Sequence, residues 1–234
     1  RIAEELKNNS LVRASYTRLS AFYASLEDYD KAIDYQVKAL DKLNQIKTGQ
    51  TPYNRVQDLT RIGDLYTARK SYEMAMSFYQ KALKLADSLK FEPIKALAHR
   101  SIISNYLTAG QPQKALDYFN QNPELKRFLE ALNFGYFVDQ SYGYIYTQLG
   151  KYDSAKYYYN KIAPFFESAA NSANQLSYNY QLALLYKKTG EYDKSLEYLL
   201  RTNQQAMGIG QLEMMKQVAY DLDTLYQLKG DYKQ

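Results

Sequence analysis

The residues of this chain that could perform acid–base or metal chemistry are few and scattered. His99 is the single histidine, and there is no cysteine. These counts exclude a His-rich metal site, a Cys–His nucleophile pair and any disulfide. The acidic pairs Glu4-Glu5 and Glu27-Asp28 fall at a helix surface and at a turn, where we interpret them as solvated charges. We therefore predict no catalytic residue, no metal site, no cofactor and no enzymatic activity.

The segment Gly208-Ile209-Gly210 comes nearest to a phosphate-binding loop. Glu213 follows it where a third glycine would be needed, and the segment joins two expected helices rather than a strand and a helix. We interpret it as a turn between helices.

Composition points to an all-helical protein that binds neither nucleic acid nor lipid. The net charge is only +5 and no long run of Lys or Arg occurs, so a nucleic-acid partner is not expected. No apolar run approaches 18 residues, so no membrane span is expected within this sequence. The 26 tyrosines and the absence of tryptophan are unusual, and we expect most of these tyrosines to pack between helices. Arg1 stands inside an expected helix without a leader before it, so the sequence is expected to be part of a longer protein.

The elements that position all of these residues follow an internal repeat. Turn glycines recur every 40 residues, at Gly110, Gly150, Gly190 and Gly230. Aligning the chain on its turns shows a tyrosine four residues before each turn, which we call the shared tyrosine, and a small residue in the helix after it. The shared tyrosines are Tyr23, Tyr66, Tyr106, Tyr146, Tyr186 and Tyr226, and the small residues are Ala32, Ala75, Ala115, Ala155 and Ser195. A period of this size indicates a repeat architecture of helix pairs, and the small residue allows the two helices of a pair to approach closely.

In this pattern the chain resembles the tetratricopeptide repeat (TPR) family. The second repeat shows the family motif best, with Leu59, Ile62-Gly63, Tyr66, Tyr72, Ala75, Tyr79 and Ala82. The sequence departs from the family in its 40-residue period and at the first aromatic position of the motif, which holds His99, Asp139, Asn179 and Ala219. We therefore interpret His99 as a packed helix residue rather than a general base. The resemblance implies an all-α, right-handed α-solenoid of antiparallel helix pairs, a TPR superhelix.

The resemblance also implies a single solenoid over residues 1–234. Residues 1–9 would be the tail of a preceding helix, and the repeats would lie near 13–55, 56–95, 96–135, 136–175, 176–215 and, truncated, 216–234. The expected helices are 11–26 with 29–47, 53–69 with 72–89, 93–109 with 112–121, 124–149 with 152–170 and 173–189 with 192–207, followed by 210–229. Pro123 is expected to begin an extra helical segment up to Leu132, and Pro164 to kink or end its helix.

The candidate binding surface is the inner, concave face, which the first helix of each TPR pair would line. Positions spaced three or four residues apart on these helices share one face. We call the residues at these positions the first-helix stripe. The predicted peptide-binding residues on it are Gln57, Thr60, Asp64, Thr67, Arg100, Ser104, Gln140, Tyr144, Thr147, Tyr180, Lys187, Gln217, Tyr220 and Gln227. Amides and aromatic rings of this kind can hydrogen-bond an extended peptide and stack on its side chains. We expect Tyr144, Tyr180 and Tyr220 to expose aromatic area there, which favours a ligand over a merely solvated face.

One known use of this stripe is not implied. The chaperone-binding members of the family carry a carboxylate clamp of Lys, Asn and Arg. At two pairs of its positions this sequence has Thr17 with Ala21 and Thr60 with Asp64.

The function that the resemblance implies is a protein- or peptide-binding module. The tyrosine-rich, cysteine-free repeats are similar to the sensor regions of bacterial membrane-anchored histidine kinases and transcriptional regulators, which places the module in signal transduction. That similarity favours the periplasmic face of a membrane, with a cytoplasmic location as the alternative. Two other functions stay open: an intracellular regulator that binds a signalling peptide, and an assembly scaffold or homodimerisation element without a ligand.

Overall fold

The computed structural model describes residues 9–46, 51–90, 92–131, 135–168 and 173–230. Within these ranges the chain forms twelve helices and no strand. It divides into two compact units, Arg1–Phe128 and Leu129–Gln234. None of the helices in the described ranges combines the length and the apolar character that crossing a membrane requires.

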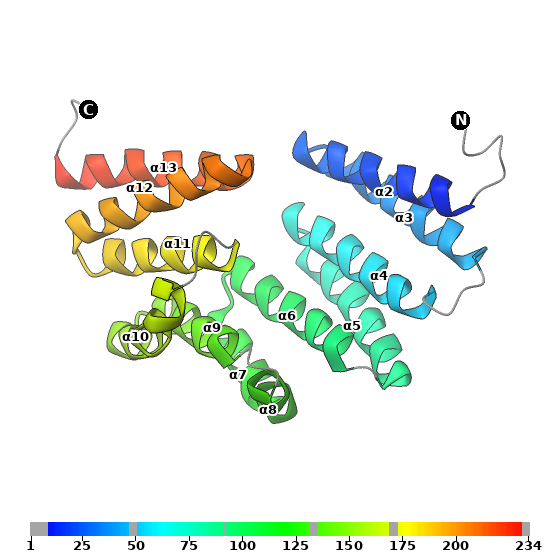
Figure 1. Ribbon diagram of the computed structural model, residues 1–234, viewed down its shortest axis with the longest axis horizontal. Coiled ribbons are helices and arrows are strands. Elements are labelled where there is room, and N and C mark those ends of the chain that lie inside the picture. Colours follow the sequence, from blue (N-terminus) through cyan, green and yellow to red (C-terminus); the bar gives the residue numbers. More distant parts are fainter. Residues whose placement is uncertain (1–8, 47–50, 91, 132–134, 169–172, 231–234) are drawn as a thin grey trace. The chain divides into compact units, whose positions relative to one another are not determined.

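Both units consist of helices that pack in pairs (Figure 1). Unit 1 contains α2 (Asn9–Ser25), α3 (Tyr29–Asn44), α4 (Thr51–Ala68), α5 (Tyr72–Leu89), α6 (Glu92–Thr108) and α7 (Pro112–Gln121). The helix α8 (Pro123–Ala131) crosses the boundary between the units. Unit 2 contains α9 (Gly135–Gln148), α10 (Tyr152–Ser168), α11 (Ala173–Lys188), α12 (Tyr192–Ile209) and α13 (Leu212–Lys229). Each first helix (α2, α4, α6, α9 and α11) is followed after a short turn by its second helix.

The turn inside each pair has the same backbone geometry. One residue in it adopts a left-handed conformation, with φ of 68°, 71° and 77° at Gly110, Gly150 and Gly190. The N–H of the next residue donates to the carbonyl of the shared tyrosine, for example from Glu191 to Tyr186 over 2.9 Å. This is the Schellman ending of a helix, which favours glycine because a side chain costs free energy at positive φ. The first two repeats use Glu27 and Lys70 at this position, so the glycine spacing could not reveal them.

Ring pairs hold the helices of each pair together next to the turn. The shared tyrosine lies against an aromatic residue twelve positions later, in the second helix. The ring centroids are 5.4 Å apart in Tyr23–Tyr35 and Tyr66–Phe78, 6.1 Å in Tyr106–Tyr118, and 5.6 Å in Tyr146–Tyr158 and Tyr186–Tyr198. The prediction that these tyrosines pack between helices is therefore confirmed.

The tightest contact within a pair is a second-helix tyrosine that lies over a first-helix glycine. A Cβ atom placed on Gly63 would lie 2.4 Å from Cε1 of Tyr79, and one on Gly143 would lie 2.8 Å from Cε1 of Tyr159. Both rings are fully buried. The small residues predicted for the second helices, Ala32, Ala75, Ala115, Ala155 and Ser195, are also fully buried. Small side chains thus let the helices approach until the large rings fill the remaining space.

The irregular region after the third repeat also folds as the prolines predict. The helix α7 ends at Gln121, and Pro123 begins the separate helix α8. The prediction allowed Pro164 either to kink or to end the second helix of the fourth repeat. It does not end the helix, because α10 continues through Pro164 to Ser168. Pro164 is exposed. The segment Gly208-Ile209-Gly210, predicted as a turn, is a turn only at Gly210. The helix α12 continues through Gly208 and Ile209, and Gly210 is its left-handed cap. The single-solenoid organisation and the repeat boundaries stay predictions, and the tail predicted at 1–9 lies almost entirely outside the described residues.

Adding a methyl group at Gly143 tests the ring-over-glycine contact. We expect Gly143→Ala to lower the free energy of unfolding by about 1–3 kcal/mol, because Tyr159 is enclosed and cannot move away. Urea denaturation measures this change.

The matched control is Gly208→Ala, the same substitution within α12. No atom lies within 4 Å of the added Cβ there. This variant should be as stable as the parent or more stable by up to about 0.5 kcal/mol, because alanine is a better helix former than glycine and Gly208 lies near the helix end. Equal effects of the two substitutions would contradict the close-packing account.

Candidate functional site

The structure divides the predicted first-helix stripe into buried and exposed residues. Thr60, Gln140 and Thr147 are buried, while Gln57, Thr67, Tyr144, Tyr180 and Lys187 are half-buried. Asp64, Arg100, Ser104, Gln217, Tyr220 and Gln227 are exposed. Much of the polar character of the stripe therefore serves the packing between helices rather than an open surface.

In unit 1, two stripe residues on α4 are bound to the buried tyrosine of the helix pair. The hydroxyl of Tyr79 donates to Oδ1 of Asp64 over 2.8 Å, and it lies 3.0 Å from Oγ1 of Thr67. Thr67 in turn donates to Oδ1 of Asn105 on α6 over 2.8 Å. Burial and the neighbouring Asp64 raise the pKa of Tyr79, so its hydroxyl stays protonated and remains a donor. These stripe residues connect neighbouring repeats.

A second polar group of unit 1, centred on Asp58, was missed by the sequence analysis. The carboxylate of Asp58 on α4 is fully buried, and the Arg13 guanidinium on α2 donates to both of its oxygens at 2.9–3.1 Å. Gln36 on α3 donates to the same carboxylate over 3.0 Å. Burial raises the pKa of Asp58, and the hydrogen bonds from Arg13 and Gln36 oppose that rise. The sequence contained one signal of this buried carboxylate. Asp58 stands eight residues before the shared tyrosine, where other repeats have a buried apolar residue: Ala98, Val138 and Val218.

Unit 2 contains a comparable group, in which three stripe residues surround Asp221. Asp221 on α13 is buried. The hydroxyl of Tyr180 on α11 donates to its Oδ2 over 2.8 Å, and Gln217 donates to the same oxygen over 3.1 Å. The Lys187 ammonium at the end of α11 donates to Oδ1 over 2.5 Å. Burial raises the pKa of Asp221, but the hydrogen bonds from Lys187, Gln217 and Tyr180 outweigh that effect, and the pKa lies below its ordinary value. Lys187, predicted as a peptide-binding residue, is therefore one half of a largely buried ion pair.

The exposed part of the stripe in unit 2 lies on α13. Tyr220 is 69% exposed, and Gln217 and Gln227 are exposed on the same helix. The expectation that three tyrosines expose their rings holds only for Tyr220. Tyr144 and Tyr180 are half-buried, because the helices packed around them cover their rings and Asp221 accepts from the Tyr180 hydroxyl. The aromatic surface of the stripe is therefore concentrated at Tyr220.

His99 has the surroundings of a packed residue, as predicted. It is buried on α6, and its Nδ1 lies 2.7 Å from the hydroxyl oxygen of Tyr118 on α7. Its Nε2 is buried without a hydrogen-bond partner. Burial lowers the pKa of His99, and Lys95 lowers it further, against smaller opposite effects of Glu124 and Asp87. In the described ranges, no three His, Asp or Glu side chains gather in a group that could hold a metal ion.

Removing the Asp221 carboxylate tests whether this group holds two repeats together. We expect Asp221→Asn to lower the free energy of unfolding by about 3 kcal/mol, because Lys187 then keeps its charge in a largely buried place without a counter-ion. Chemical denaturation measures the loss. The control is Asp193→Asn, which removes the partner of Lys229 at a site where the Asp193 side chain is 93% exposed. It should cost at most about 1 kcal/mol. Similar losses for both variants would show that burial of the pair is unimportant.

The lowered pKa of His99 predicts a dependence of stability on pH. A histidine with a lower pKa in the folded state than in the unfolded state stabilises the fold above about pH 6.5, and this contribution is lost as the pH falls. We expect the free energy of unfolding to fall below that pH by at most about 1.4 kcal/mol per pH unit from this group. Because His99 is the single histidine, His99→Gln should flatten the dependence between pH 7 and 5. An unchanged slope in the variant would contradict this assignment.

Comparison with known protein families matches four segments of the chain to the tetratricopeptide repeat. The matched residues are 14–41, 59–88, 140–163 and 176–201. No curated protein matches the chain in sequence.

Solved structures of TPR proteins are similar in fold. A Rap protein complexed with competence and sporulation factor has a TM-score of 0.67 at 20% identity, over 94% of this chain and 66% of that chain. BtubC from P. vanneervenii has a TM-score of 0.63 at 17% identity, over 90% and 86%. A signal transduction ATPase with a TPR sensor, from Pyrococcus horikoshii, has a TM-score of 0.62 at 16% identity, over 93% and 34%. The chain thus spans just under two thirds of the Rap protein. With its helix pairs, its Schellman turns and four matched repeats, the chain is a tetratricopeptide repeat protein with the all-α solenoid fold of that family.

Proposed function

We propose that this chain is a non-enzymatic protein-interaction module and that the first-helix stripe of each unit binds an extended peptide segment. In unit 2 the main contacts are Tyr220, Gln217 and Gln227 on α13. In unit 1 they are the exposed Arg100 and Ser104 on α6, with Gln57 on α4.

The observation that carries this proposal is the exposed ring of Tyr220 between two exposed glutamines on one helix face. A tyrosine offers a large contact area at a low cost in conformational entropy, and it is enriched at binding surfaces. Gln217 and Gln227 each use the amide nitrogen in a bond within α13, to Asp221 and Asp223. Their amide oxygens take no part in those bonds and can accept from the backbone N–H groups of a peptide.

The Asp221 group supports the proposal from below this surface. It fixes Gln217 and joins α13 to Tyr180 and Lys187 of α11 through charge-assisted hydrogen bonds. A surface held in one conformation loses less entropy when it binds a ligand. The stripe residues that are unavailable to a peptide thus keep the available ones in place.

The proposal includes a signalling role, as the sensing or interaction region of a larger bacterial protein. Its support is the similarity of fold to a Rap protein solved with a bound factor and to a signal transduction ATPase with a TPR sensor. In this role, ligand capture would favour one packing of neighbouring repeats over another.

Selection of binding peptides followed by single substitutions tests the site. Linear 12-residue peptides are selected from a displayed library against the purified chain, and the affinity of a selected peptide is measured by calorimetry. We expect Tyr220→Ala to weaken that peptide about tenfold or more, because loss of a central aromatic contact at an interface costs over 1 kcal/mol.

The matched control is Tyr157→Ala on the second helix α10. Tyr157 is 64% exposed, so this variant also loses an exposed tyrosine ring, but at a position outside the stripe. Both variants should keep the parent's melting temperature within a few degrees. A library that yields no binder, or peptides that bind both variants equally well, would overturn the assignment of the stripe.

A further inference from the structure

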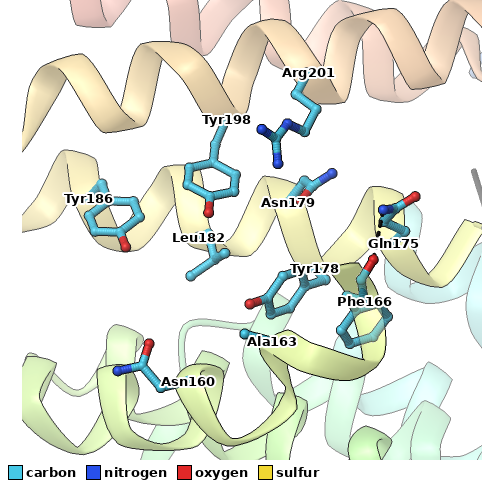
Figure 2. Close-up of a pocket in the computed structure, with 10 residues that line it drawn as sticks. All are labelled: Asn160, Ala163, Phe166, Gln175, Tyr178, Asn179, Leu182, Tyr186, Tyr198 and Arg201. Atoms are coloured by element: carbon cyan, nitrogen blue, oxygen red, sulfur yellow. Dashed lines mark hydrogen bonds between the residues drawn. The ribbon is translucent and has the colours of Figure 1, made fainter. Parts of the chain in front are cut away.

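Unit 2 contains a pocket of about 310 Å³ among α10, α11 and α12 (Figure 2). It is lined by Asn160, Ala163, Phe166, Gln175, Tyr178, Asn179, Leu182, Tyr186, Tyr198 and Arg201. On α11 the pocket is lined by Tyr178, Leu182 and Tyr186, whereas the stripe residues are Tyr180 and Lys187. Because 3.6 residues make one turn, these two sets lie on opposite faces of the helix. The pocket is therefore separate from the first-helix stripe, and it includes none of the positions of the carboxylate clamp.

Two stacked ring pairs line the pocket. Tyr178 stacks on Phe166 with centroids 4.4 Å apart and an angle of 13° between the rings. Tyr186 stacks on Tyr198 at 5.6 Å and 21°. Leu182 lies between these pairs in Figure 2. A planar group of side-chain size can contact these rings.

A chain of amide hydrogen bonds fixes the end of the pocket near Gln175. Asn179 donates to Gln205 over 3.0 Å, Gln205 donates to Gln175 over 3.0 Å, and Gln175 donates to the carbonyl oxygen of Phe166 over 2.9 Å. The chain connects α11, α12 and α10 in turn. It holds the three helices at a fixed separation while the pocket between them stays open.

The charge of the pocket comes from Arg201. Of the ten described residues that line it, Arg201 is the one cation and none is acidic. Its guanidinium lies over the ring of Tyr198, 5.3 Å from the centroid. It donates to Glu197 over 3.0 Å, but these two side chains are 50% and 61% exposed. An exposed pair of this kind contributes little, so a ligand carboxylate can compete for the guanidinium and bind two of its five donors.

The end of the pocket away from Arg201 offers hydrogen-bond acceptors. Figure 2 shows Asn160 on the far side of the pocket from Arg201. Pro164 follows four residues later in the same helix, and it has no N–H to donate to the Asn160 carbonyl. The Asn160 side-chain amide adds a second oxygen. An N–H or ammonium group of a ligand can be bound at this end.

We propose that this pocket binds a small carboxylate the size of one amino acid, with its carboxylate at Arg201 and its apolar part between the two ring pairs. The pocket volume equals about ten water molecules at roughly 30 Å³ each, which suits a ligand of about ten non-hydrogen atoms. The same chemistry exists in a free amino acid and in the last residue of a peptide. The inference does not depend on the proposed function, because it concerns the opposite face of α11.

Three probes identify the ligand and its source by calorimetry with the complete chain. They are L-phenylalanine, the tripeptide Ala-Ala-Phe with a free carboxylate, and the same tripeptide with an amidated end. Binding of the free amino acid, of the free-carboxylate tripeptide or of both, without binding of the amidated tripeptide, supports the proposal and names the source. Binding of neither carboxylate at millimolar concentration, or equal binding of the amidated tripeptide, overturns it.

Two substitutions locate the binding. Arg201→Gln should weaken the carboxylate about tenfold or more, because a hydrogen bond to a charged group is lost. Ala163→Leu fills the pocket from α10 and should abolish binding while circular dichroism and the melting temperature confirm the fold. The control Arg69→Gln removes an arginine that is also paired and half-exposed, with Asp30 in unit 1, and should leave the affinity unchanged. Binding that survives both pocket variants, or that is lost equally in the control, would overturn the assignment.

Discussion

The rest of this structure depends on the close approach of the two helices within a pair. In the second and fourth repeats that approach is set by a tyrosine ring over a glycine, Tyr79 over Gly63 and Tyr159 over Gly143. Nothing larger than glycine fits beneath these rings, so the glycine is required at this separation of the two helices. The fifth repeat has Ala183 and Leu199 at the same two positions, both buried in one apolar cluster. In these three repeats a small first-helix residue therefore lies opposite a large second-helix residue. Beside each turn, the stacked ring pair provides a second contact between the same two helices.

Contacts between repeats combine buried apolar clusters, such as Ala82 and Ala86 of α5 with Ile94 and Ala98 of α6, with buried carboxylates. In unit 1 the buried carboxylate of Asp58 accepts from Arg13 of the preceding first helix, and in unit 2 Asp221 accepts from Lys187 of the preceding first helix. A buried carboxylate is stable only with its hydrogen bonds in place, so these groups accept one register of the two helices and penalise others. The two aspartates thus add a register requirement to the apolar packing between the repeats.

The same arrangement decides where a ligand can bind. Along the first-helix stripe, the groups that would attract a ligand most strongly are already occupied: Lys187 by Asp221, and Asp64 by the Tyr79 hydroxyl. The contacts proposed for a peptide are therefore the exposed residues of the stripe, with Tyr220 as the main aromatic one. On the other face of α11, the amide chain through Gln205 joins the helices around a pocket with an arginine at its edge. One helix thus presents two surfaces of different chemistry.

The sequence by itself determined the repeat, the helix pairs, the turns and the buried small residues. These features depend on local geometry: a left-handed residue favours glycine, a helix repeats every 3.6 residues, and proline ends or begins helices. These local rules have exceptions in this chain: Glu27 and Lys70 adopt the left-handed conformation in place of glycine, and α10 continues through Pro164. Only the tertiary structure decided which stripe residues stay exposed, how Asp58 and Asp221 gain their partners, and where the pocket lies. Those outcomes depend on distances between side chains some 20 to 45 residues apart, and periodicity along one helix carries no information about such distances.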